Sequence, residues 1–155
     1  MSESIKLKIG LSGTYWDRPP KFKIILSQKE YFSGSISKPS GEVEYFEFPA
    51  DLEDGEQSLD IQLLEKEFSD VQKNEDGSIA NDQLLNIESI EIDDIDLGNL
   101  KYTASIYTPS IKQEYNGEII EQLPNCVNLG WNGTYSIKFN TPFYIWLLES
   151  LWDII

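Results

Sequence analysis

The chain has 155 residues, which is enough for one domain that buries its own core without disulfides or a metal. Hydrophobic residues make up 40% and charged residues 25%, an ordinary composition for a globular protein. The 27 acidic residues outnumber the 12 basic ones and give a formal charge of −15. This charge repels phosphate backbones and anionic lipid surfaces, so we expect no nucleic-acid partner and no membrane partner.

Two residue counts exclude further chemistries. The sequence has no histidine, which removes imidazole acid–base catalysis and histidine metal ligands. Its one cysteine, Cys126, allows no intrachain disulfide and no thiolate zinc site. A lone cysteine fits a reducing compartment, and residues 1–4 lack the features of a signal peptide. We therefore expect synthesis in a cytoplasm without secretion, and no apolar run is long enough to predict a membrane span.

The first half of the chain alternates apolar and polar residues with the period of β-strands. Residues 5–11 place Ile5, Leu7, Ile9 and Leu11 on one face, which predicts a half-buried strand. Residues 12–20 read as a loop because two consecutive prolines end any strand pairing. Further strands are predicted over residues 22–26, 31–36, 42–48 and 59–63.

The second half continues the same pattern between longer polar segments. Residues 68–83 and 111–124 are predicted as two long loops. Strands are predicted over residues 85–92 with a bend near Ser89, over 102–107, 127–131 and 135–139. Asn132-Gly133 is a strong signal for a two-residue hairpin turn between the last two of these strands.

The C-terminus has a different character. Thr141 is a suitable N-cap and Pro142 suits the first helical position, so a helix is predicted to follow. Residues 143–155 contain ten apolar or aromatic residues and only two charges, so the helix must bury itself in this protein or in another chain. We divide the chain into a β-domain (1–140) and a helix (141–155) for packing or docking. The residues predicted to dock a partner are Phe143, Trp146, Leu147, Leu151 and Trp152.

Short strands at regular spacing predict the fold class. About eight strands separated by turn signals are typical of an all-β protein, here a jelly-roll-like antiparallel β-sandwich with a short C-terminal hydrophobic helix. An α/β fold would need amphipathic helices between the strands, and the sequence does not provide them.

The segment from residue 51 to residue 96 holds 16 carboxylates against two lysines, Lys66 and Lys73. One interpretation is a solvated face that keeps the protein soluble. The other is a site for a hard cation such as calcium, which binds six to eight oxygens. The loop over residues 74–82 partly resembles an EF-hand loop, but Gln72 and Gln83 would occupy positions that require charge.

Several aromatic residues lie in or beside the predicted loops. Aromatic rings stack on sugar rings and on bases, and the negative charge disfavours bases. Tyr15, Trp16 and Trp131 are therefore the candidate glycan-binding residues, although any of them could instead serve as a core or edge plug.

Two segments carry a resemblance to a known family. Gly55-x-Gln57-x-Leu59-x-Ile61-x-Leu63, followed after a long loop by residues 81–92, resembles the calcium-dependent, xylan-binding type of carbohydrate-binding module. The resemblance implies a small jelly-roll sandwich in which loop carboxylates hold calcium and sugar hydroxyls bridge the metal. It implies Asp82 as a ligand, with Asp76 and Asp70 beside it, and calcium as the cofactor. Glu65-Lys66 stands where the family has an Asn-Asp pair.

The whole chain is also similar to small proteins encoded by tailed bacteriophages, on the runs over residues 12–22 and 123–134. This similarity implies a virion location and a non-catalytic structural or binding module that decorates the capsid or tail. Its partners would be other virion proteins, or a second copy through the C-terminal helix, and cell-surface glycans. The alternative is a free-standing, calcium-dependent, lectin-like module. A glycosidase with two carboxylates and an acidic mimic of nucleic acid stay open, although no specific motif favours either.

Overall fold

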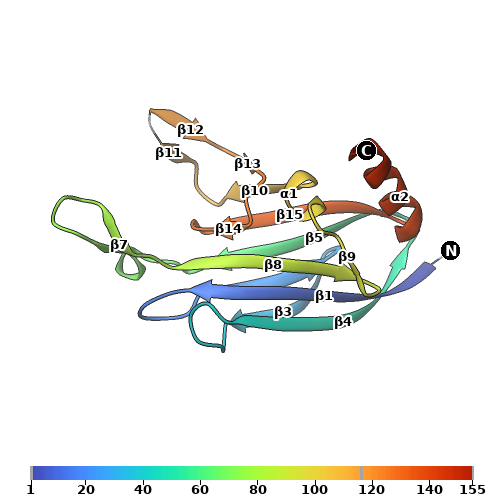
Figure 1. Cartoon of the computed structure of the whole chain (residues 1–155), viewed down its shortest axis with the longest axis horizontal. Coiled ribbons are helices and arrows are strands. Elements are labelled where there is room, and N and C mark those ends of the chain that lie inside the picture. The colour runs from blue at the N-terminus through green and yellow to red at the C-terminus, as the bar shows by residue number, and fades with distance from the viewer. Residues whose placement is uncertain (1, 116, 155) are drawn as a thin grey trace.

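The computed structural model describes residues 2–115 and 117–154, with only the backbone described at residues 115 and 151–154. Most of its regular structure is β-strand (Figure 1). The elements in chain order are β1 (Ser2–Thr14), β2 (Lys21–Leu26), β3 (Lys29–Ser35), β4 (Val43–Glu53), β5 (Gly55–Leu64), the 3-10 helix η1 (Phe68–Asp70), β6 (Gln72–Lys73), β7 (Ile79–Asn81), β8 (Leu84–Ile92), β9 (Ile95–Asp96), α1 (Leu100–Thr103), β10 (Ser105–Pro109), β11 (Gln113–Tyr115), β12 (Glu118–Ile120), β13 (Leu123–Pro124), β14 (Asn128–Leu129), β15 (Gly133–Thr141) and α2 (Phe143–Ile154).

Two antiparallel sheets form the body of the protein. One sheet has the order β14-β8-β1-β4, with β9 paired to β8, and the other has the order β13-β10-β15-β5-β2-β3. Rings from the two sheets pack against each other across the core, as Phe22 of β2 and Phe46 of β4 do with centroids 5.3 Å apart. The prediction of an all-β antiparallel sandwich with a short C-terminal helix is confirmed.

Alternation along the strands supplies the core. Ile5, Leu7, Ile9 and Leu11 of β1 are all buried, as the period of two predicts. In β8 the alternation is interrupted once, because the buried residues are Leu85 and Ile87 and then Ile90 and Ile92. The pairing of β8 with β1 shifts register between Gly10 and Leu11, opposite the bend expected near Ser89. This irregularity returns both halves of the strand to the core face.

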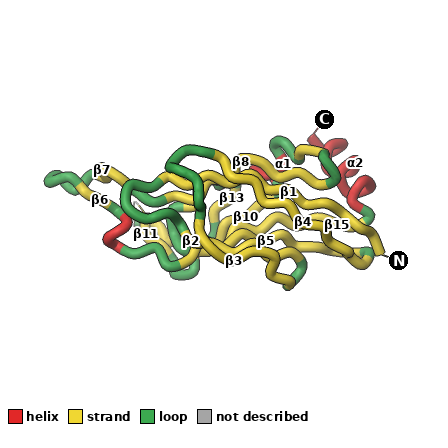
Figure 2. Tube along the Cα trace, turned by 90° about the horizontal axis from the view of Figure 1, so that it is seen from below, coloured by secondary structure: helices red, strands yellow, loops and turns green. Residues whose placement is uncertain are grey.

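The two segments predicted as long loops contain short hairpins. Residues 68–83 form η1 and the β6–β7 hairpin, and residues 111–124 form the β11–β12 hairpin and β13. Two views at right angles place β6 and β7 at the end of the sandwich away from α2 (Figure 1, Figure 2). The predicted strand over 102–107 is also corrected, because its first residues belong to α1 and the strand β10 begins at Ser105.

The expected Asn132-Gly133 hairpin turn is wrong. β14 pairs with β8 in one sheet and β15 pairs with β5 and β10 in the other, so this dipeptide connects two sheets. Glycine is needed at position 133 for a different reason, because a Cβ there would lie 2.5 Å from the backbone oxygen of Thr108. Only glycine allows β10 to approach this closely.

The C-terminal helix packs on its own domain. Phe143 and Leu147 of α2 are buried, and the rings of Phe143 and Trp146 lie 6.4 Å and 5.9 Å from the ring of Phe139 in β15. These helix positions share one face because they are three and four residues apart. Phe143, Trp146 and Leu147 therefore serve as internal packing, which corrects their assignment to partner docking. The side chains of Leu151 and Trp152 lie outside the described residues.

The start of α2 also differs from the prediction. The Thr141 hydroxyl donates to the Glu53 carbonyl oxygen at 2.7 Å, so it does not cap the helix. A carboxylate from β1 takes this role, since the Phe143 backbone N–H donates to Glu3 Oε2 at 2.9 Å. The opposite side of α2 leaves Tyr144, Ile145 and Leu148 exposed. Within the described residues, no helix has both the length and the apolar character needed to cross a bilayer.

Candidate functional site

A large cleft is lined in part by residues of β6 and β7. The β6–β7 hairpin lies at the end of the sandwich away from α2 (Figure 1). The cleft has a volume of about 1100 Å³ and is bounded by three segments that follow or precede strands. We call it the end cleft, and its lining residues are Lys66, Glu67, Phe68, Ser69, Val71, Lys73, Ile79, Asp82, Ser110, Ile111, Gln113, Gly130, Trp131 and Asn132. These residues are far apart in the sequence, and the ends of β5, β10 and β14 bring them together.

The rim of the end cleft is apolar. Phe68 is 99% exposed, and Ile79 and Ile111 are also exposed. An aromatic ring left entirely in water, beside two other exposed apolar side chains, marks a surface that a ligand can cover. Trp131 is half-buried in the same lining, so the cleft offers two aromatic rings among apolar walls with polar groups between them.

A hydrogen-bonded turn fixes the backbone around Phe68. The carboxylate of Asp70 accepts two hydrogen bonds from Arg18, from Nε at 2.7 Å and from a terminal nitrogen at 2.6 Å, and a third from the Glu67 backbone N–H at 2.7 Å. Arg18 also donates to the Glu65 carbonyl oxygen, and Trp16 donates to the Asp70 carbonyl oxygen. The hydrogen bond from Arg18 is the main reason why the pKa of Asp70 lies below its ordinary value. Asp70 therefore stabilises the turn.

The floor of the end cleft contains an ion pair. The Lys66 side chain is only 9% exposed, and its Nζ lies 2.6 Å from Asp82 Oδ1 and 2.6 Å from the Gly130 carbonyl oxygen. Asp82 Oδ1 also accepts the Gln83 backbone N–H at 2.7 Å. Both charged groups therefore have hydrogen-bonding partners within the chain. A mostly buried lysine requires such partners.

Neighbouring contacts make this floor rigid. The side chain of Asn132 bonds the backbone of Lys66 twice: it accepts from the N–H at 2.8 Å and donates to the carbonyl oxygen at 3.0 Å. The hydroxyl of Tyr107 donates to the Trp131 carbonyl oxygen and accepts its N–H at 3.0 Å. Burial is the main reason why the pKa of the Tyr107 hydroxyl is raised, so it stays a hydrogen-bond donor.

The three predicted calcium ligands have separate partners. Asp70 is bound by Arg18, Asp82 by Lys66, and Asp76 accepts the Ser78 N–H at 3.0 Å and the Ser78 hydroxyl at 2.6 Å. The hydroxyl bond from Ser78 is the main reason why the pKa of Asp76 is lowered. Among the side chains that the structure describes, no three Asp, Glu or Cys residues are grouped as a metal site requires. This donor set does not fit calcium, which needs several oxygens free to coordinate it.

Only one of the three predicted glycan-binding residues lines the end cleft. Trp131 does so. Trp16 lies behind the η1 turn, with its indole N–H on the Asp70 carbonyl oxygen, and the Tyr15 hydroxyl donates to the Lys38 carbonyl oxygen in another loop. Three residues of the cleft were not among the predicted site residues, namely Phe68, Lys66 and Asn132. A single aromatic residue in the polar run over 65–70 is the one signal that could have indicated Phe68.

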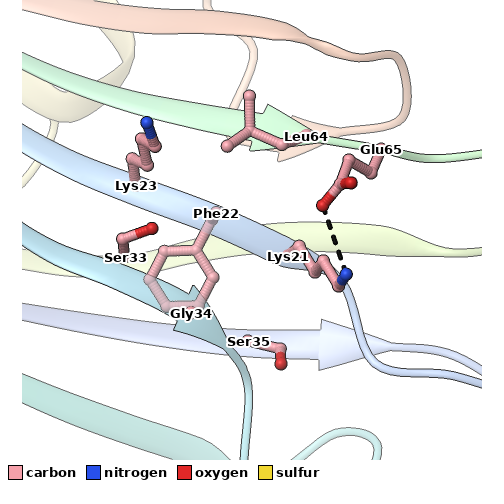
Figure 3. A pocket seen from close by; sticks show the side chains of 8 residues that line it. All are labelled: Lys21, Phe22, Lys23, Ser33, Gly34, Ser35, Leu64 and Glu65. Carbon is pink, nitrogen blue, oxygen red and sulfur yellow. Dashed lines mark ion pairs between the residues drawn. The ribbon is translucent and has the colours of Figure 1, made fainter.

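A second, smaller pocket of about 300 Å³ lies beside β2, β3 and the end of β5 (Figure 3). Its polar groups include Lys21 and Glu65, which form an ion pair at 3.2 Å. Phe22, the one aromatic residue in its lining, is completely buried in the core. This pocket therefore offers no exposed ring to a ligand, and the end cleft is the stronger candidate.

Comparisons with known proteins agree with the architecture. No protein-family model matches the chain, and a search of curated proteins finds no significant match. Among solved structures, the chain is similar to one described as "vCBM60 in complex with galactobiose", with a TM-score of 0.53, 8% identity, and coverage of 85% of this chain and 96% of that one.

A second similar structure is the selenomethionine form of vCBM60, with a TM-score of 0.55, 8% identity, and coverage of 86% of this chain and 89% of that one. Its description speaks of circular permutation between two families of calcium-dependent carbohydrate-binding modules. At this identity the similarity shows the fold alone: the chain has the sandwich of a carbohydrate-binding module.

Proposed function

We propose that this protein is a non-catalytic carbohydrate-binding module that takes a neutral oligosaccharide into the end cleft. The observation that carries the proposal is Phe68, a fully exposed ring on a hydrogen-bonded turn at the rim of a cleft that also contains Trp131. A flat apolar ring that is exposed to solvent is a surface on which the C–H face of a sugar can pack. The fold shared with carbohydrate-binding modules supports the same conclusion.

The charges of the end cleft favour a neutral ligand. Its lining contains two lysines, Lys66 and Lys73, and two carboxylates, Glu67 and Asp82, so the formal charges cancel. The rest of the protein carries the whole net charge of −15. A polyanionic glycan would therefore meet long-range repulsion without a compensating positive site, whereas a neutral sugar is insensitive to that field.

The test is a binding measurement with a matched control. Titration calorimetry with galactobiose and with a xylo-oligosaccharide should give binding to the unmodified protein, and Phe68→Ala should weaken it about tenfold or more because the stacking surface is lost. Tyr45→Ala is the control, since Tyr45 is also an exposed ring but lies on β4 outside the cleft lining. Equal loss in both variants, or unchanged binding in Phe68→Ala, would contradict the proposal. Chromatography of the sugars after incubation should show no cleavage.

A location in a phage particle stays a prediction from the resemblance of residues 12–22 and 123–134. The exposed side of α2, with Tyr144, Ile145 and Leu148, supports contact with another protein, as a capsid or tail decoration requires. Mass spectrometry of purified particles tests this part of the account, and absence of the chain from them would contradict it.

A further inference from the structure

The ammonium group of Lys66 is unusual for a lysine beside a binding cleft. It is enclosed by the protein, yet it belongs to the lining of the end cleft. An ammonium group has three N–H donors. Two of them have acceptors at 2.6 Å, namely Asp82 Oδ1 and the Gly130 carbonyl oxygen. No acceptor among the described residues takes the third.

The carboxylate of Asp82 is in a similar position. Its Oδ1 atom accepts from both Lys66 Nζ and the Gln83 backbone N–H. Its Oδ2 atom has no donor within the part of the chain that the structure describes, and Asp82 also lines the cleft. The ion pair thus leaves one donor and one acceptor next to each other, with no net charge.

We propose that the Lys66–Asp82 pair binds two neighbouring hydroxyl groups of a sugar and supplies the cation of the end cleft, so that binding does not depend on calcium. The Lys66 ammonium donates to the oxygen of one hydroxyl, and Asp82 Oδ2 accepts the proton of the next hydroxyl in a hydrogen bond. A metal ion that binds two neighbouring hydroxyl groups of a sugar contacts the oxygens of those same two groups. Lys66 already holds the Asp82 carboxylate and the Gly130 carbonyl oxygen, which are the oxygens that a calcium ion would need here.

Rigidity supports this assignment. The Lys66 backbone is fixed by its two hydrogen bonds with the Asn132 side chain, which accepts one and donates the other, and the Trp131 backbone is fixed by the Tyr107 hydroxyl. The backbone segments that carry Lys66 and Trp131 are therefore held in place before the sugar arrives. A preorganised donor and acceptor bind with less loss of entropy than two free side chains do.

This inference rests on the proposed function, and its experiment separates the two. The sugar that binds best to the unmodified protein is titrated first with excess EDTA and then with millimolar calcium, and we expect equal affinity in both. A metal requirement overturns the inference while leaving the carbohydrate-binding proposal intact. Failure of galactobiose and the xylo-oligosaccharide to bind under either condition overturns both.

Paired variants complete the test. Lys66→Met/Asp82→Asn removes both charges together, so it leaves no unpaired buried charge and should fold. We expect it to bind the sugar about tenfold or more weakly, as is usual when a hydrogen bond to a charged group is lost. The control is Lys138→Met/Glu56→Gln, which removes an exposed ion pair of 3.6 Å on β15 and β5 away from the cleft. Unchanged binding in the first double variant, with its fold confirmed by circular dichroism, overturns the inference.

Discussion

The two ends of the sandwich both expose apolar side chains, but they hold them in different ways. At the end cleft, Phe68 lies on a turn fixed by Arg18 and Asp70, and polar groups with free hydrogen-bonding capacity lie beside it. At the other end, α2 buries Phe143 and leaves Tyr144 on its outer side. The first end combines apolar surface with directional polar groups, as sugar binding requires, whereas the second offers apolar surface alone.

The largest effect on stability is expected at the α2 end. Phe143→Ala removes a completely buried ring that packs on Phe139, so it should lower the free energy of unfolding by about 3–5 kcal/mol. Leu148→Ala, on the exposed side of the same helix, should change it by less than about 0.5 kcal/mol. Urea denaturation measures both. Similar effects of the two changes would show that α2 does not pack on β15 as described.

The next largest loss of stability is expected at Gly133, in the connection between β14 and β15. Gly133→Ala places a Cβ 2.5 Å from the Thr108 oxygen and 2.8 Å from the Pro109 Cα, and both are backbone atoms that cannot move away freely. We expect a loss of about 1–3 kcal/mol in urea denaturation. Gly77→Ala is not a steric control, because Gly77 has a positive φ of 87°. Ser110→Ala is preferable, as it changes a residue next to β10 without adding an atom. A stable Gly133→Ala protein would contradict the close approach of β10.

The main strands of the sandwich were predictable from the sequence, whereas the connection at residues 132–133 was not. Alternation is a local signal, so the strands β1, β5 and β15 and their buried faces were predictable from residues two apart. Asn132-Gly133 was misleading because the same dipeptide is common in hairpin turns. Here Gly133 allows a close backbone approach and Asn132 forms a hydrogen bond with Lys66. Local sequence does not distinguish these roles.

The candidate site was less predictable than the fold. The family resemblance implied Asp82 as a metal ligand. Its ion pair with Lys66, 16 residues away, forms only in the folded chain. The apolar character of α2 predicted a buried helix. Whether the helix packs on its own domain or on another chain depends on where β15 ends. Exposure of Phe68 is likewise a property of the tertiary structure.

Asp70 links the stability of the cleft to pH. Its folded-state pKa lies below the ordinary value of 3.8, so the stability that it contributes is complete above that value and is lost as the pH falls below it. Asp70→Asn should therefore cost about 1.5 kcal/mol at neutral pH, at the low end of charged hydrogen bonds because Arg18 stays partly exposed. Denaturation at several pH values should show the difference from the unmodified protein shrinking below about pH 4. A difference that is independent of pH would contradict the Arg18 contact.

The smallest effect on stability should accompany the largest effect on binding. Phe68 is 99% exposed, so Phe68→Ala should change the free energy of unfolding by less than about 0.5 kcal/mol while weakening sugar binding. Phe143→Ala should show the opposite balance, provided that it is measured under conditions where it stays folded. Destabilisation by Phe68→Ala would mean that the ring packs within the protein and is not available to a ligand.

Sugar binding in the end cleft can be located directly by a nuclear magnetic resonance titration of the unmodified protein with galactobiose and with a xylo-oligosaccharide. We expect the backbone signals of Lys66, Phe68 and Trp131 to shift on addition of the sugar that binds, while those of α2 and of the pocket beside β2 and β3 stay in place. Shifts confined to α2 or to that pocket, or no shifts with either sugar, would contradict binding in the end cleft.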